Sequence, residues 1–134
     1  MKKKLIAASV LILFLSACGS SPQDHREALL ELGVRWEGDG FLDRAKQGDQ
    51  AVLELFLKGG MDLETRDGSG ATALMYAALN GHGEVASLLI EEGAQVNAQD
   101  NLGRRALDYA TVQPESGAFK ILASAGALYG TAAQ

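Results

Sequence analysis

The chain has 134 residues, which is enough for one domain. A hydrophobic share of 47%, with 16 Gly and 2 Pro, excludes a disordered chain or a Pro-rich linker and predicts many turns between short elements. The formal net charge of −5 disfavours nucleic acids and anionic lipid surfaces as partners, because an acidic surface repels phosphate groups.

The first segment is predicted to be an export signal. Lys2–Lys4 form a positive start, and residues 5–15 form an apolar stretch that is too short for a membrane-spanning helix of about 20 residues. The run Leu15-Ser16-Ala17-Cys18 that ends this stretch resembles the lipobox of bacterial lipoproteins, in which a peptidase cuts before the Cys. The resemblance implies that residues 1–17 are removed and that Cys18 is lipidated. Signal cleavage elsewhere and an unmodified thiol are the alternatives.

Lipidation would anchor the rest of the chain to a membrane of the cell envelope. Cys18 is the only Cys, so the exported domain needs no disulfide. The next residue is Gly19 and not Asp, which among Gram-negative lipoproteins implies the periplasmic face of the outer membrane. Loss of residues 1–17 removes three Lys and no acid, so the formal net charge falls from −5 to −8, and a basic or neutral partner fits better. Residues 18–23 would be a short lipidated tether.

A helix is expected directly after the tether. Asp24 through Leu32 place Ala28, Leu29 and Leu32 on one side, and Gly33 follows. We therefore expect residues 24–33 to form an N-terminal cap that covers the core of the unit that follows.

The strongest signal in the sequence is an internal repeat with a period of about 33 residues. Seven residues recur at this spacing, namely Gly48, Val52, Leu55, Phe56, Gly60, Leu63 and Asp67 as Gly81, Val85, Leu88, Leu89, Gly93, Val96 and Asp100. A third copy carries Gly103, Leu107, Ala110, Ile121, Leu122, Gly126 and Ala127. Three units at about residues 34–66, 67–99 and 100–128 are predicted, and such a period is typical of a solenoid whose units bury their apolar faces against one another.

Each unit should contain two short antiparallel helices. In the middle unit, Thr72 can cap the first helix and Gly81 can end it. The second apolar stripe runs to Gly93, and we expect its Leu88 to lie in the stack between units. Gly68-Ser69-Gly70 would serve a tight hairpin, because Gly adopts positive φ without strain.

The middle unit resembles an ankyrin repeat. Residues 67–78 look like its hairpin and first helix, and residues 81–98 look like its turn, second helix and exit loop. Ala73 and Met75 depart from the family's Thr-Pro-Leu-His pattern, so one hydrogen bond from a His should be missing. The resemblance implies an all-α ankyrin-repeat solenoid with β-hairpin-like loops over residues 24–134, whose third unit acts as a C-terminal cap.

The resemblance also implies a binding surface on the hairpin tips and on the exposed face of the first helices. Carried over by register, its residues are Lys46, Gln47, Arg66, Ser69, Ala71, Leu79, Asn80, Gln99, Asn101, Leu102, Arg104, Val112 and Gln113. Leu79, Leu102 and Val112 would form an apolar centre, with Arg66 and Arg104 at a charged rim. Any single one of these residues could instead be merely exposed to solvent.

Catalytic and metal-binding patterns are missing from the sequence. His25 and His82 are the only histidines and have no second ligand at metal spacing, so neither a metal nor another cofactor is expected. His82 could act as a general base, but its place in the turn favours a structural role, in which the imidazole binds backbone. Glu91 and Glu92 fit a solvated helix face. We therefore do not expect an enzyme.

Two classes of function remain open. The favoured one is a membrane-anchored adaptor or inhibitor of the bacterial cell envelope that binds a protein partner through hairpin tips and inner helices. The alternative is an envelope protein that binds a small molecule or an ion and supports stress defence, with a pocket between the cap and the first unit near Trp36.

Overall fold

The computed structural model describes residues 21–127, which form seven helices and no strands. Their bounds are α2 Pro22–Glu31, α3 Gly38–Gln47, α4 Gln50–Lys58, α5 Ala73–Leu79, α6 Gly83–Glu91, α7 Ala106–Ala110 and α8 Gly117–Ser124. The predicted signal, Cys18 and the end of the third unit after residue 127 lie outside the described residues. Between residues 21 and 127, no helix combines the length and the apolar character needed to cross a membrane.

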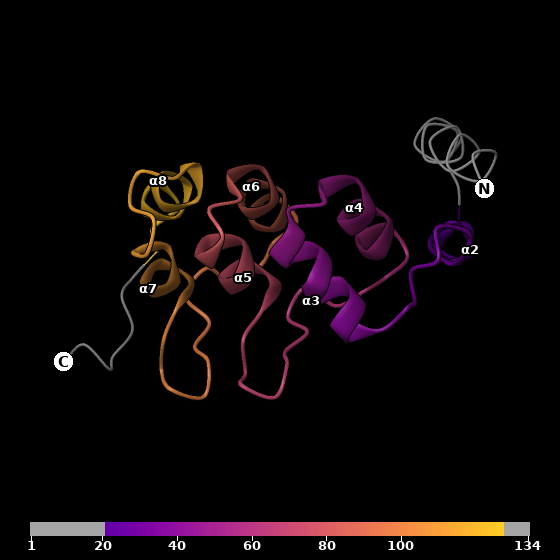
Figure 1. Ribbon diagram of the computed structural model, residues 1–134, viewed down its shortest axis with the longest axis horizontal. Helices are drawn as coiled ribbons and strands as arrows, with labels where there is room; N and C mark the ends of the chain where they lie inside the picture. Colours follow the sequence, from indigo (N-terminus) through magenta and orange to yellow (C-terminus); the bar gives the residue numbers. More distant parts are fainter. Residues whose placement is uncertain (1–20, 128–134) are drawn as a thin grey trace.

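The helices form a row of antiparallel pairs, as the repeat predicts (Figure 1). The first helices of the units are α3, α5 and α7, and the second helices are α4, α6 and α8. The second helices form one layer, and long loops extend from the layer of first helices on the side away from them. Helix α2 packs against α4 at one end of the row. The predicted all-α solenoid with an N-terminal cap helix is confirmed.

The cap helix begins slightly earlier than the sequence indicated. Ser21 caps it, because its Oγ accepts a hydrogen bond from the backbone N of Asp24 at 3.4 Å. Pro22 stands at the first helical position, where its missing N–H costs nothing. Residues 22–23, which the sequence assigned to the tether, therefore belong to α2. Ala28 and Leu29 are buried as expected.

The core consists of apolar positions that recur from unit to unit. Phe56, Leu89 and Leu122 occupy equivalent positions on the three second helices, and each is 0% exposed. The prediction for Leu88 is corrected, because this side chain is only partly buried and its neighbour Leu89 occupies the stack. Adjacent leucines on a helix point about 100° apart, and the pattern alone did not decide which one faces the core.

The helix cap and the glycine turns of the middle unit are largely as predicted, and Met75 takes the place of the family's His. Thr72 caps α5, since its Oγ1 accepts from the backbone N of Met75 at 3.4 Å. The sulfur of Met75 lies 3.4 Å from the backbone N of Thr72 and accepts where the family's His would bond. Gly70 and Gly81 have φ of +78° and +73°, as expected, whereas Gly68 does not have positive φ.

Candidate functional site

The hairpin surface consists of residues 66–71 and 99–104, together with the exposed residues of the first helices and of the turns that follow them. Each loop closes as a hairpin through a backbone hydrogen bond across its base. The N of Asp67 donates to the O of Ala71 at 3.2 Å, and the N of Asp100 donates to the O of Arg104 at 2.9 Å. The loops extend side by side from the helical layers (Figure 1).

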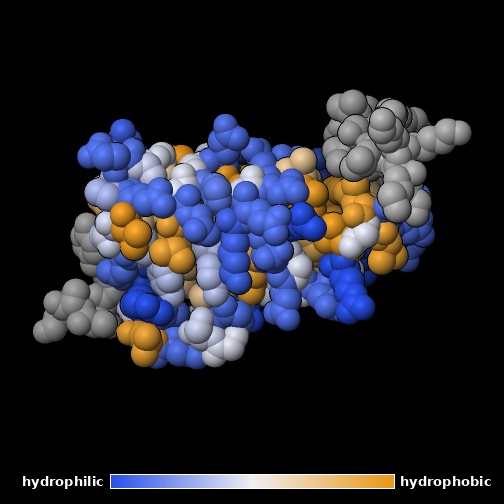
Figure 2. Space-filling view, viewed as in Figure 1, coloured by the Kyte–Doolittle hydropathy of each residue, from blue (hydrophilic) through white to orange (hydrophobic). Residues whose placement is uncertain are grey.

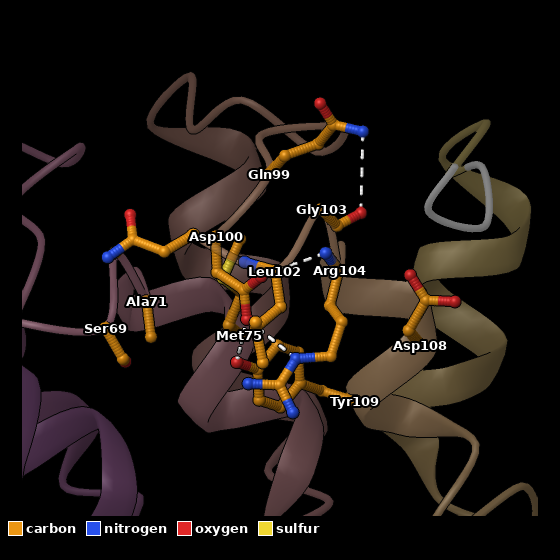
Figure 3. A network of polar contacts seen from close by, with 12 residues as sticks. Ser69, Ala71, Met75, Gln99, Asp100, Leu102, Gly103, Arg104, Asp108 and Tyr109 are labelled. Carbon is orange, nitrogen blue, oxygen red and sulfur yellow. Dashed lines mark hydrogen bonds and ion pairs between the residues drawn. The ribbon is translucent and has the colours of Figure 1, made fainter. Parts of the chain in front are cut away.

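A buried carboxylate holds the second hairpin in place (Figure 3). The side chain of Asp100 is 0% exposed and accepts hydrogen bonds from the backbone N of Leu102 and of Arg104, both at 2.9 Å. It also accepts from Nε of Arg104 at 2.8 Å and from the hydroxyl of Tyr109 at 2.5 Å. Because Tyr109 belongs to α7, these bonds fix the hairpin to the first helix of its own unit.

The first hairpin repeats this arrangement. Asp67 accepts from the hydroxyl of Tyr76 on α5, and from the backbone N of Ser69 and of Ala71 at 2.9 and 3.1 Å. The Asp67–Tyr76 pair stands one repeat before the Asp100–Tyr109 pair. The unit at residues 34–66 has Val34 and Asp43 at the equivalent positions, so it cannot form the same pair.

The pKa values of these pairs show which form each group keeps. Burial opposes the charge of Asp67, but hydrogen bonds from Ser69, Tyr76 and the backbone outweigh it and lower its pKa to about 2. Burial and the hydrogen bond to Asp100 raise the pKa of Tyr109 to about 12. Each carboxylate therefore stays charged and each phenol stays neutral near neutral pH.

Several of the predicted binding residues join one hairpin to the next. Asn101 donates from its backbone N to the O of Ser69 at 3.0 Å, and from Nδ2 to the O of Gly68 at 3.1 Å. Arg66 donates from Nη1 to the O of Gly70 and of Gln99. A Cβ on Gly70 would lie 2.5 Å from Oδ1 of Asn101, so only Gly permits this approach.

Other predicted residues join successive first helices. Nδ2 of Asn80 donates to the O of Lys46 at 3.1 Å, and Nε2 of Gln113 donates to the O of Leu79 at 3.5 Å. Nε2 of His82 lies 2.9 Å from the O of Lys46, which supports the structural role expected for this His. These side chains hold neighbouring repeats together. Because their hydrogen-bonding groups are used within the chain, fewer of these groups are left for contact with a partner.

Two apolar side chains on the hairpin surface remain exposed. Leu102 at a hairpin tip is 67% exposed, and Val112 beyond the end of α7 is 66% exposed. Figure 2 shows an apolar group at the tip of the loop that holds residues 100–104, surrounded by hydrophilic surface. Two basic groups lie over aromatic rings nearby, with Nζ of Lys46 4.3 Å from the ring centre of Tyr76 and Cζ of Arg104 4.9 Å from that of Tyr109.

Two of the residues that were expected to be exposed, Ala71 and Leu79, need correction. Ala71 is 1% exposed, because the hairpin turns its small side chain inward, so it offers no surface. Leu79 is half-buried. The Arg104 side chain is 45% exposed, so its place at a charged rim stays a prediction, with its charge paired to Asp100.

The other predicted residues bond to groups that are close to them in the sequence. Gln47 donates from Nε2 to Asp43 at 2.6 Å, and Ser69 donates from Oγ to Asp67 at 2.6 Å. Gln99 donates from Nε2 to the O of Gly103 at 3.4 Å.

Sequence reasoning missed the two tyrosines of this surface. Tyr76 and Tyr109 each follow an Asp at the same separation, and the two pairs recur at the period of the units. This signal was available in the sequence. The sequence does not show that each Asp of a hairpin lies beside the Tyr of the following helix, and this contact is seen only in the folded structure.

Trp36, near which the alternative function would place a pocket, contacts both the cap helix and α4. Trp36 stacks on Phe56 with 5.5 Å between ring centres, and Cζ of Arg26 lies 4.5 Å from the Trp36 ring centre. Nε of Arg26 donates to the O of Gly59 at 2.8 Å, which ties the cap helix to the end of α4. Among the described residues, no three His, Cys, Asp or Glu side chains gather as they would around a metal ion.

The comparisons with known proteins agree with this geometry. A family model described as Ankyrin repeats (3 copies) matches residues 42–132. A search of curated proteins found no match. Ankyrin repeats generally act as protein-binding scaffolds, and typically without catalysis of their own. Because the matched segment is more than half of the chain, and the structure shows its repeating helix pairs and hairpins, this chain belongs to the ankyrin-repeat family.

Proposed function

We propose that the chain is a lipid-anchored adaptor or inhibitor of the bacterial cell envelope, which holds a partner protein on its hairpin surface. Family membership supports protein binding in general. The observation that carries the proposal is the exposure of Leu102 and Val112 on a surface where several predicted polar contact residues, such as Asn80, Asn101 and Gln113, instead bond to the preceding unit. Apolar side chains displayed on a rigid support are the usual centre of a protein interface.

The rigidity of the hairpins supports tight binding. Asp67 and Asp100 fix each loop to its own helix, and Asn101 and Arg66 fix the loops to each other through bonds to Gly68 and Gln99. Binding of a partner here does not require a flexible loop to become ordered. The entropy lost when a loop becomes ordered is one of the main costs that weaken binding at an interface. The hairpins can therefore present Leu102 at little entropic cost.

The sequence of the first 23 residues supports the envelope location. The apolar stretch followed by Leu15-Ser16-Ala17-Cys18 favours lipidation at Cys18, and Gly19 favours the outer membrane in a Gram-negative cell. Acyl chains contribute about 0.8 kcal/mol for each buried CH₂, so a diacylated Cys gives a lasting anchor. Helix α2 starts at Pro22, so very few residues separate the anchor from the folded repeats.

Affinity capture with a paired substitution tests the proposal. Leu102→Lys combined with Val112→Lys puts two charges on the surface, and both sites are exposed, so the fold should persist. Capture from detergent-solubilised envelopes should give one stoichiometric protein with the wild type, and the paired variant should bind it about thirtyfold more weakly, as expected for loss of a hot spot worth about 2 kcal/mol.

Leu30→Lys is the matched control for this experiment. Leu30 is 63% exposed on α2, at the opposite end of the array, so its variant should bind the partner like the wild type. Equal capture by the paired variant and the wild type would rule out the hairpin surface as the binding site. A substitution of Arg104 is unsuitable, because it would leave the buried Asp100 without its cation.

A further inference from the structure

A groove runs between two second helices on the part of the molecule away from the hairpin tips. It consists of two adjoining hollows between α4 and α6, of about 320 Å³ and about 400 Å³. The residue common to both is Leu88. Because α4 and α6 belong to the layer opposite the hairpins in Figure 1, this groove is separate from the hairpin surface.

The floor of the groove is apolar. Leu57 of α4 and Leu88 of α6 pack against the core from one side and are only partly buried. The equivalent of Leu88 in the preceding unit is Leu55, which is 3% exposed on the helix that α2 covers. The cap helix therefore covers this position in the first unit, whereas the same position in the second unit keeps apolar surface open.

The walls of the groove are acidic. One hollow is bordered by Glu54 and Glu92, and the other by Glu84 and Glu91. The basic residue among the lining groups is Lys58, whose Nζ lies 3.8 Å from Glu54. Both members of that pair are partly exposed, and such pairs exchange partners at little cost. Four carboxylates against one ammonium leave a net negative charge around the two leucines, with Glu84 near the start of α6 and Glu91 and Glu92 at its end.

We propose that this groove binds a short cationic segment of a partner protein, in which an aliphatic residue lies between two Lys or Arg residues. The aliphatic side chain would cover Leu57 and Leu88. One basic group would reach Glu84 near the start of α6, and the other would reach Glu91 and Glu92 at its end. This goes beyond the proposed hairpin function, because it is a second site with a different chemistry.

The dimensions of the groove match a short extended segment. A helix of nine residues such as α6 is about 13 Å long at 1.5 Å per residue. Extended chain advances about 3.3 Å per residue, so the first and fifth residues of a segment also stand about 13 Å apart. Side chains of the first, third and fifth residues point to the same side of an extended chain, which lets one aliphatic and two basic groups face the groove together.

A labelled peptide tests this site directly. The probe is a fluorescent Lys-Ala-Leu-Ala-Lys peptide, and its anisotropy is followed as it is titrated with the full chain in a neutral detergent. Saturable 1:1 binding is expected for this peptide. A Glu-Ala-Leu-Ala-Glu peptide should not bind, because the carboxylates of the groove repel it. A peptide with Ser at the centre should bind more weakly, because it loses the contact with the floor.

Two variants with the same change in charge locate the site. Glu84→Gln with Glu91→Gln should weaken binding of the first peptide about tenfold, as expected for loss of two ionic contacts. Glu27→Gln with Glu31→Gln removes two exposed carboxylates from α2 and should change the affinity less than about twofold. The hairpin variant Leu102→Lys with Val112→Lys should bind the peptide normally, so failure at one site is distinguishable from failure at the other.

Three results would overturn the proposal. Equal weakening by both Gln pairs would show that the peptide responds to the overall charge of the protein and not to the groove. Displacement of the peptide by spermidine at an equal concentration would show that the apolar floor contributes nothing. A peptide signal that never saturates would show that no site is present.

Discussion

The side chains of the hairpin surface divide into those that hold the structure and those that are available to a partner. Asn80, Asn101 and Gln113 were predicted as contact residues, and each donates a hydrogen bond to the backbone of the preceding unit. Sequence reasoning placed them at the surface but could not show this use, because it depends on the spacing of neighbouring units. Leu102 and Val112 instead keep apolar surface open, at 67% and 66% exposure.

The Asp–Tyr pairs make the stability of the hairpins depend on pH. The pKa of Asp67 falls to about 2 in the folded chain from an ordinary value of 3.8. A lowered pKa stabilises the fold above the ordinary value, and this contribution is lost as the pH falls from about 4 to about 2. We expect the thermal unfolding midpoint of the wild type to drop over this window by more than that of Asp67→Asn, as measured by circular dichroism.

The phenol of Tyr109 makes the stability depend on pH at the alkaline end of the range. Its pKa rises to about 12 from 10.0, so its contribution is complete below pH 10 and is lost as the pH rises toward about 12. Tyr109→Phe should remove this alkaline loss and should lower the stability at neutral pH by about 1 to 3 kcal/mol, because Asp100 loses a donor while buried. A Tyr109→Phe chain as stable as the wild type at pH 7 would contradict the role given to this pair.

At the scale of elements, the repeat period predicted the helix pairs well, because it reflects a core that every unit must share. It predicted the details less well where one unit departs from the others. Helix α2 begins at Pro22, not at Asp24, because Ser21 is an adequate cap that the apolar pattern does not register. Ala71 was placed on the binding surface because of its position in the hairpin, but its side chain is buried. Position along the repeat does not show which hairpin side chains point inward.

The column of Phe56, Leu89 and Leu122 supplies the contact between units. Leu89→Ala should destabilise the fold by about 2 to 5 kcal/mol, because it leaves a cavity between neighbouring second helices. Leu88→Ala should cost only about 1 kcal/mol, because its side chain is partly exposed at the groove. Denaturant unfolding of the two variants side by side checks the assignment, and a larger cost for Leu88 would reverse it.

At the scale of the molecule, the described residues form an array with a closed end and two different long sides. Helix α2 covers the first unit, with Arg26 placed over Trp36 and bonded to the end of α4. The hairpin side carries the exposed apolar residues, and the side of the second helices carries the acidic groove between α4 and α6. An anchor just before α2 would hold this array close to the membrane.

The anchor is tested by changing its acceptor. Cys18→Ser removes the thiol that lipidation requires, so the variant should appear as an unprocessed or a soluble exported form. The wild type should stay with the membrane fraction after a carbonate wash. If Cys18→Ser also stays with membranes after that wash, the lipoprotein assignment is wrong.

Site-specific photo-crosslinking in living cells tests the central claim most directly, because it reports what lies against one chosen residue. A photoreactive phenylalanine derivative placed at position 102 or 112 should join the chain to the same protein at both positions. The same derivative at position 30, where the native Leu30 is equally exposed, should not give this product. A product of the same size from position 30 alone, with none from positions 102 and 112, would contradict the assignment of the hairpin surface as the binding site.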